Sequence, residues 1–246
     1  MEPSTRGNNL TNCCPVCGES ETKIIAEHVK GGKVKQGADV KVLRCEDCDF
    51  DFLEIWNDVE RANEWYAKDE YVMKPDQSGS SIRYFEGSAL KFNIYEVCVN
   101  QVKLFLKPDS RVLDVGCGDG QFLKMIRDRV GEVQGVEVTP TLVEFLRNQG
   151  IPVWDKPIQE CEPDRPYDII VMHALLEHIP RISDFLEDLK RFMHDSSMIF
   201  FSVPHGLDPL TRYFDVPNYR DHFYREYHFY YFTEKSMGKL LEKAGF

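Results

Sequence analysis

Residues 112–123, VLDVGCGDGQFL, constrain the fold more than any other stretch of this chain. A β-branched apolar run ends at Gly116, and two more glycines, Gly118 and Gly120, precede a segment of helical pattern. The spacing is G-x-G-x-G, which differs from the G-x-G-x-x-G of dinucleotide-binding folds, and no Lys-Ser/Thr pair of a phosphate loop follows. The segment predicts a strand, a tight turn and a helix, with a turn that either binds a ligand without a phosphate or binds nothing.

Strand and helix patterns alternate along the chain from residue 81 onward. Apolar residues have helical spacing in four segments and form short buried runs in five others. The predicted helices are 88–106, 121–130, 141–150 and 182–195, and the predicted strands are 111–116, 132–138, 151–155, 167–173 and 197–204. Regular alternation predicts an α/β fold with a Rossmann-like, doubly wound and mainly parallel sheet, which binds ligands at the carboxyl ends of its strands.

Acidic residues beside the glycine turn indicate what the ligand carries. Asp114 precedes Gly116, where a carboxylate would repel a pyrophosphate but suit a cationic group. Glu137 ends the next predicted strand, 21 residues after Gly116, where it can accept hydrogen bonds from both hydroxyls of a ribose. A ligand with a ribose, a cationic group and no phosphate matches S-adenosylmethionine.

Three motifs resemble those of the class I S-adenosylmethionine-dependent methyltransferases: VLDVGCGDG, GVEVTP and YDIIVMHALLEHI. The resemblance covers about residues 85–246. It implies that Gly116, Gly118 and Gly120 line the aminocarboxypropyl arm of the cofactor and that Asp114 supports this loop or meets the amino group. It also implies that Glu137 binds the ribose.

The resemblance extends to other cofactor contacts. Val138 should pack on the adenine, and His173 and Ala174 should offer backbone groups to the methionine part. Trp154, Asp155 and Ile158 follow the third strand, where such enzymes hold the adenine edge. These enzymes usually complete the sheet with an antiparallel hairpin, which we expect to be missing here because the sequence stops at Phe246.

Two C-x-x-C pairs, Cys14/Cys17 and Cys45/Cys48, predict a second and smaller domain. Two such turns complete a tetrahedral Cys₄ zinc site, and the strand-like segments 22–29 and 38–44 between them are typical of a zinc ribbon. Since all four ligands come from the protein, the zinc is expected to be structural, with Cys13 as the spare thiol.

These features predict three parts: a zinc ribbon at 1–60, a connector at 61–80 and the cofactor domain at 81–246. The combination resembles methyltransferases of deoxysugar and surface-polysaccharide pathways. Members that methylate carbon carry a Tyr-x-Glu-His-x-x-Tyr-Phe segment, whereas here Arg225 and Tyr227 replace its Tyr and Glu, and only His228, Tyr231 and Phe232 match. This departure favours O-methylation, and the resemblance implies a small molecule or glycan as acceptor.

Three histidines are candidates for a base that deprotonates an acceptor hydroxyl: His228 first, then His205 and His178. Each follows a predicted strand or lies in the aromatic segment 210–232, and each can equally serve as a structural hydrogen-bonding group. The aromatic segment itself is expected either to pack as a lid on the core or to form a wall for the acceptor.

Composition narrows the partners. A net charge of −11 disfavours nucleic acid, no apolar run is long enough to span a bilayer, and MEPSTRGNNL lacks a signal-peptide core, so we expect a cytoplasmic protein. Two alternatives stay open at this point: an RNA methyltransferase guided by the ribbon, and a binding protein that retains the cofactor fold without catalysis.

Overall fold

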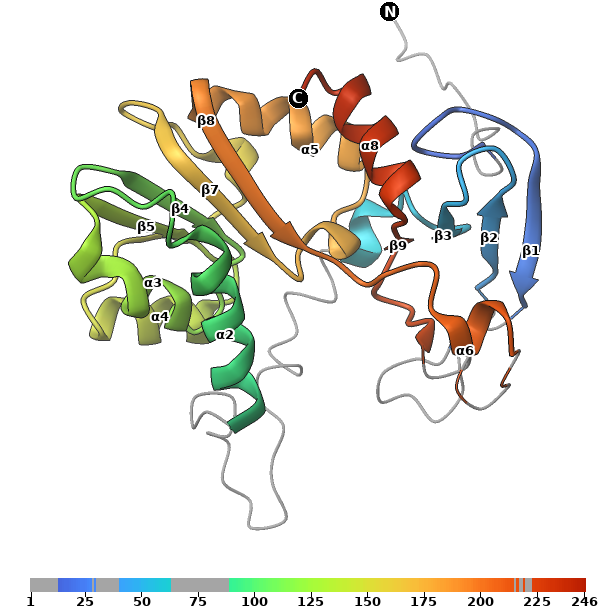
Figure 1. Cartoon of the computed structure of the whole chain (residues 1–246), viewed down its shortest axis with the longest axis horizontal. Helices are drawn as coiled ribbons and strands as arrows, with labels where there is room; N and C mark the ends of the chain where they lie inside the picture. The colour runs from blue at the N-terminus through green and yellow to red at the C-terminus, as the bar shows by residue number, and fades with distance from the viewer. Residues whose placement is uncertain are drawn as a thin grey trace, which may run out of the picture. The chain divides into compact units, whose positions relative to one another are not determined.

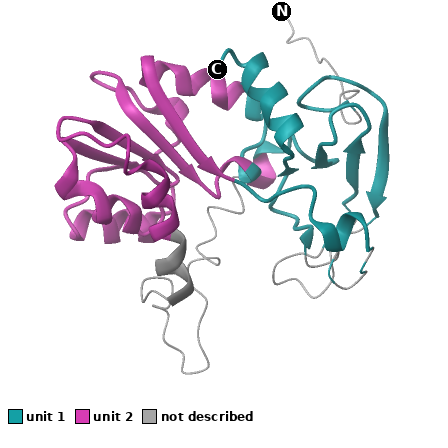
Figure 2. Ribbon diagram, in the orientation of Figure 1, with its two compact units in different colours: residues 1–59, 177–183, 203–246 teal, residues 60–176, 184–202 magenta. Residues whose placement is uncertain are grey.

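The computed structural model describes residues 13–27, 29, 40–62, 89–214, 216, 219 and 223–246 (Figure 1). The predicted connector, apart from Arg61 and Ala62, lies outside these residues, as do His28 and His222. The chain forms two compact units: Met1–Val59, Glu177–Ser183 and Val203–Phe246 in unit 1, and Glu60–Leu176 and Asp184–Ser202 in unit 2 (Figure 2).

Unit 2 contains the predicted doubly wound sheet. Its five strands are all parallel and lie in the order β6-β5-β4-β7-β8 (Figure 1). They are β4 Arg111–Val115, β5 Glu132–Val136, β6 Val153–Trp154, β7 Tyr167–His173 and β8 Met193–Ser202. The strand order reverses between β4 and β7, and this switch point is where folds of this type bind ligands. The α/β, Rossmann-like fold class is confirmed.

The helices of unit 2 follow the predicted alternation. They are α2 Ala89–Val102, α3 Gln121–Ile126, α4 Pro140–Asn148 and α5 Ile182–Leu189, the last of which begins within the unit 1 range. α2, α3 and α4 bury apolar side chains in one core with Val112 of β4 and Ile169 and Val171 of β7. This amphipathic burial is what the helical spacing of the sequence predicts.

One predicted helix ends earlier than its pattern indicates. The segment 182–195 is an α-helix only to Leu189, continues as a 3₁₀ turn, and becomes β8 at Met193. Met193 pairs with Tyr167 at the start of β7. Residues from Met193 onward are therefore part of a strand, although their spacing in the sequence is helical.

Unit 1 is built on a four-stranded antiparallel sheet in the order β1-β2-β3-β9. Two strands were expected, and they correspond to β1 Thr22–Ala26 and β2 Val42–Cys45. The other two, β3 Asp51–Leu53 and β9 Tyr230–Tyr231, were not. β9 lies in the aromatic segment and pairs with β3, so the C-terminal part of the chain completes the N-terminal sheet. The helices of this unit include α6 Pro209–Arg212 and α8 Glu234–Lys243.

The compact units therefore differ from the predicted domains for residues 203–246. These residues were expected with the cofactor domain, but β9 pairs with β3, and Tyr230 and Phe232 stack on Phe50. Five aromatic side chains of the segment are buried: Tyr224, Phe229, Tyr230, Tyr231 and Phe232. This burial supports the expectation that the aromatic segment packs in a core.

A buried carboxylate, that of Asp51, links the parts of unit 1. Arg44 donates two hydrogen bonds to it, at 2.6 and 2.8 Å, and the Tyr224 hydroxyl donates a third at 2.8 Å. Burial raises the pKa of Asp51, and the Arg44 charge opposes this rise. Since Asp51 is fully buried, the pair is stable only as long as both partners remain.

Among the described residues, no helix combines the length and apolar character that a membrane span requires.

We expect Arg44→Ala to lower the local unfolding free energy of the unit 1 sheet by up to about 3–5 kcal/mol, because it leaves the buried Asp51 charge with only the Tyr224 hydroxyl and the more distant Arg212 guanidinium, at 3.8 Å. Hydrogen exchange of peptides covering β2 and β3, measured over a urea series, reports this change. Lys23→Ala is the matched control, since it removes an ion pair with Glu46 from the same sheet where both side chains are more than half exposed. Its expected cost is at most about 1 kcal/mol. Equal effects of the two substitutions would contradict the assignment.

Candidate active site

The glycine turn follows β4 at the carboxyl edge of the unit 2 sheet. Gly116, Gly118 and Gly120 all have positive φ, at 74°, 56° and 68°. A Cβ on Gly120 would lie 2.4 Å from a methyl carbon of Leu146. Left-handed backbone and close packing both require glycine here, so the backbone of the turn is uncovered by side chains of its own.

The Glu137 carboxylate holds this turn. One of its oxygens accepts the N–H of Gly118 at 3.0 Å, and the other accepts those of Val138 and Thr139 at 2.9 Å each. The side chain is 6% exposed. The Thr139 side chain also hydrogen-bonds to this carboxylate, which therefore ties the turn after β4 to the chain that follows β5.

Two more carboxylates lie at the same edge of the sheet. Burial, together with the charges of Glu137 and Asp119, raises the pKa of Asp114 to about 8. Asp119 accepts hydrogen bonds from the Tyr95 hydroxyl at 3.0 Å and from the N–H of Gln121 at 3.2 Å. The sequence prediction did not include Asp119, although its place between Gly118 and Gly120 was a signal. Three buried carboxylates favour a cationic ligand.

The end of β7 provides the next predicted residues. Ala174 has a φ of 47°, and its N–H donates to the Ser202 carbonyl at 3.0 Å, so only its carbonyl remains for a ligand. The His173 Nδ1 contacts the Cys98 sulfur at 3.2 Å, while its Nε2 is buried with no hydrogen-bond partner among the described residues. Burial lowers the pKa of His173 to about 4, so its ring is neutral at pH 7.

The residues predicted at the adenine lie in different surroundings. Val138 is 38% exposed, as a residue that packs on a ligand should be. Asp155 instead forms an exposed ion pair with Arg147 at 2.8 Å. Trp154 packs edge-on against Tyr167, and Ile158 is buried. The Asp155 carboxylate is therefore engaged by Arg147, and the Ile158 side chain packs inside the protein.

Two of the three candidate histidines lie together in unit 1. The rings of His178 and His228 are 4.7 Å apart between centroids and nearly perpendicular. Burial lowers the pKa of His178 to about 4 and, together with the charges of His178 and Arg225, that of His228 to about 3. His205 is exposed, lies outside this pair, and accepts the N–H of Leu207 at 3.2 Å on its Nδ1.

A third group joins the histidine pair and was missed in the sequence. Glu177 is 2% exposed, and burial raises its pKa to about 7. One ligand atom from each of Glu177, His178 and His228 lies within 4.8 Å of the others. The signal was the Glu-His pair of LLEHIP, in which only the histidine was considered.

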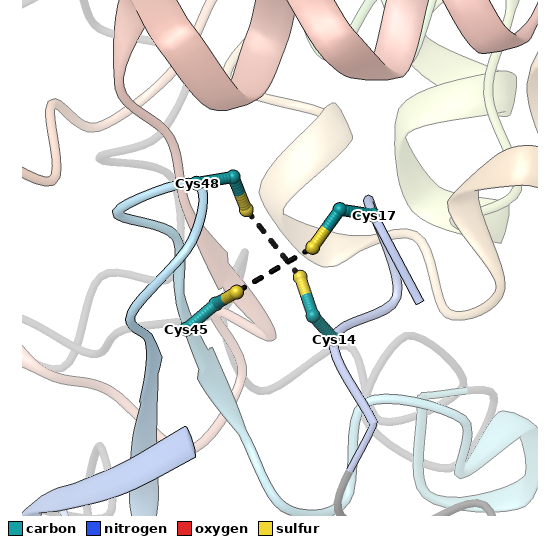
Figure 3. Close-up of side chains that lie close together, drawn as sticks. All are labelled: Cys14, Cys17, Cys45 and Cys48. Carbon is teal, nitrogen blue, oxygen red and sulfur yellow. Dashed lines mark hydrogen bonds between the residues drawn. The ribbon is translucent and has the colours of Figure 1, made fainter. Parts of the chain in front are cut away.

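The four cysteines of the C-x-x-C pairs converge in unit 1 (Figure 3). The Cys14 and Cys48 sulfurs are 3.5 Å apart and those of Cys17 and Cys45 3.4 Å apart, too far for disulfides. A tetrahedral site with Zn–S bonds of about 2.3 Å places sulfurs about 3.8 Å apart, so this cluster fits zinc closely.

The chain matches one family model and is similar in sequence to several known proteins. The family model described as "Methyltransferase domain" matches residues 90–246, more than half of the chain. The chain is 26% identical over 102 residues to the ubiquinone biosynthesis O-methyltransferase of Bordetella bronchiseptica, covering 38% of this chain and 42% of that protein. It is 19% identical over 141 residues to the malonyl-[acyl-carrier protein] O-methyltransferase of Acetivibrio thermocellus, covering 55% and 50%. The chain thus spans half or less of the length of these relatives.

A solved structure has the same fold. A SAM-dependent methyltransferase from Archaeoglobus fulgidus superposes with a TM-score of 0.51 at 23% identity, covering 67% of this chain and 72% of that one.

We expect Asp114→Asn to stabilise the ligand-free protein increasingly as the pH rises from about 4 to about 8. The raised pKa means that folded Asp114 binds a proton that the unfolded chain, with a pKa near 3.9, releases, so wild-type stability declines across this window. Asparagine does not titrate. Melting temperatures at pH 5, 6, 7 and 8 should show a growing advantage of the variant. The control, Asp128→Asn, changes a side chain that is 93% exposed and should show none. A difference that is constant with pH would contradict the placement of Asp114.

Proposed function

The chain belongs to the methyltransferase-domain family with the class I S-adenosylmethionine-dependent fold, and from that premise we propose that it transfers the methyl group of S-adenosylmethionine to an oxygen of a small molecule. The glycine turn at the switch point, edged by Asp114, Asp119 and Glu137, is the observation that carries the proposal. Its uncovered backbone and negative charge suit the aminocarboxypropyl arm and the sulfonium of this cofactor.

Each residue has a distinct part in this proposal. Gly116, Gly118 and Gly120 leave room for the arm, and Glu137 binds the ribose while it holds the turn. Val138 packs on the adenine. The Ala174 carbonyl and the unpartnered Nε2 of His173 are the polar groups available to the methionine part. We keep Asp155 as a proposed adenine-side residue, which would have to leave its ion pair with Arg147.

The sulfonium of the bound cofactor supplies an electrophilic methyl group, so the protein contributes chiefly by alignment. A hydroxyl acceptor gains from a group that takes up its proton or its developing charge. His178, His205 and His228 are the proposed residues for this. The neutral rings of His178 and His228 can bind either a proton or a cation, and either use makes an acceptor hydroxyl more nucleophilic.

We propose a sugar, carried on a nucleotide or in a glycan, as the acceptor class. Tyr213 and Phe214 in unit 1 are 74% and 70% exposed, and exposed aromatic faces are suited to stacking on sugar rings. The relatives named as O-methyltransferases favour an oxygen acceptor. A net charge of −11 disfavours RNA.

We propose that Cys14, Cys17, Cys45 and Cys48 bind one structural zinc ion. Three of them are buried, all four sulfurs converge, and a four-thiolate set leaves no position for substrate. Such a site would hold the end of β2 and its neighbours in place without a chemical role.

We expect the protein to transfer labelled methyl groups from S-adenosylmethionine to at least one member of a panel of nucleotide sugars. Glu137→Ala should weaken cofactor binding about 10- to 150-fold in calorimetry, because a charge-assisted contact of about 1.5–3 kcal/mol is lost. Asp128→Ala, at an exposed position, is the control.

The two measurements separate the parts of the proposal. Unchanged affinity in Glu137→Ala would show that the ribose is not bound there. Cofactor binding without transfer to any sugar, but with transfer to phenols or carboxylic acids, would overturn the acceptor class alone.

We expect the wild-type protein to hold about one zinc ion per chain. Cys45→Ser should lose this ion or release it readily, since a three-thiolate site binds zinc more weakly. Elemental analysis after dialysis against a chelator measures this, and hydrogen exchange should increase in β1 and β2. Cys13→Ser is the matched control, because Cys13 lies outside the cluster. Full zinc retention in Cys45→Ser would refute the four-cysteine site.

A further inference from the structure

Unit 1 contains a second cluster of metal-ligand side chains, separate from the four cysteines: Glu177, His178 and His228. Their ligand atoms lie within 4.8 Å of one another, and the His178 Nε2 is 3.8 Å from a Glu177 oxygen. Cis ligands of a metal with bonds of about 2.1 Å are separated by about 3.0–3.4 Å. A contraction of less than an ångström would bring this pair to coordinating distance.

Two atoms of the cluster have no partner. The Oε2 of Glu177 and the Nδ1 of His228 are buried, and neither has a hydrogen bond among the described residues. Buried polar atoms in native proteins are nearly always hydrogen-bonded, and a specific exception indicates an unseen ion or water. No described Lys or Arg side chain lies within ion-pair distance of Glu177, and the basic group beside it is His178, at 3.8 Å.

The backbone orients the third ligand. The His178 Nδ1 lies 2.8 Å from the Tyr227 carbonyl oxygen, which can only accept, so Nδ1 carries the proton and Nε2 is the unprotonated nitrogen that can act as a ligand. Metal-binding histidines typically donate their other N–H to a carbonyl or carboxylate in this way. The N–H of Phe229 also donates to the Glu177 carbonyl at 2.6 Å, which ties both parts of the cluster together.

We propose that Glu177, His178 and His228 bind a divalent first-row transition metal ion. Two imidazoles and one carboxylate are a donor set suited to zinc or ferrous iron rather than to magnesium or calcium. Three protein ligands leave coordination positions open, unlike the four-cysteine cluster, so an oxygen of a small molecule could complete the site. That last role rests on the proposed function; metal binding itself does not.

Cobalt(II) distinguishes this site from the cysteines, because thiolate ligands add an intense charge-transfer absorption that nitrogen and oxygen ligands lack. The protein, with zinc retained at the cysteines and the weaker site stripped by a mild chelator, should bind one further cobalt ion per chain without thiolate absorption. Glu177→Gln and His228→Ala should each weaken this binding by more than about 100-fold, beyond the 10- to 100-fold usual for groups that only orient a ligand. His194→Ala, at an exposed histidine of unit 2, should leave it unchanged.

Copper(II) electron paramagnetic resonance provides a test that does not depend on affinity. Wild-type protein should show coupling to two nitrogens, and His228→Ala to one. Near-UV circular dichroism confirms that the variants are folded, and Glu177→Gln keeps the shape of the side chain. The proposal is overturned by wild-type protein that binds cobalt only with thiolate absorption, or by unchanged affinity in both variants. Metal binding without methyl transfer would leave this site standing and overturn the proposed activity.

Discussion

One carboxylate, that of Glu137, fixes the edge of the sheet on which the candidate site depends. It lies just after β5 and accepts N–H groups from its own strand end and from Gly118 in the turn after β4. Parallel strands bring their carboxyl ends to one edge, but the register alone does not set the path of a turn of three left-handed glycines. The buried Glu137 carboxylate sets the path of the turn, because it accepts three N–H groups from both sides of this edge. The same carboxylate is the group proposed to bind the ribose.

The Glu137 carboxylate lies near two other buried carboxylates, and this arrangement is destabilising in the absence of a ligand. Asp114, Asp119 and Glu137 are all buried, and their mutual repulsion adds to the burial that raises the pKa of Asp114. A site like this is less stable empty than with a cation bound, because a bound positive charge relieves both effects. The conflict between ligand-free stability and ligand affinity is typical of binding sites, and here it explains why the buried strand β4 has an aspartate, Asp114, just before its last residue.

The sequence predicted the parts that local patterns determine. The central strands β4 and β7 are apolar runs because both of their faces are buried, and the glycine positions follow from backbone that only glycine adopts readily. The missed features depend on partners distant in sequence. β9 is two residues long and exists through its pairing with β3, and Glu177 is noteworthy only because Tyr227 and Phe229 bring His228 beside it. The helix that ends at Leu189 was overridden by pairing with β7 in the same way.

In unit 1, the position of His228 depends on the strands that the four-cysteine cluster adjoins, and the reverse does not hold. Cys45 ends β2, β2 pairs with β3, and β3 pairs with β9, whose first residue lies two positions after His228. The Asp51 carboxylate reinforces this path by joining Arg44 of β2 to Tyr224. The cluster of four cysteines therefore belongs to the framework that positions His228, whereas the cluster of Glu177, His178 and His228 lies at the end of this path. Rigid ligands behind an open coordination site are the arrangement that binding a variable oxygen ligand requires.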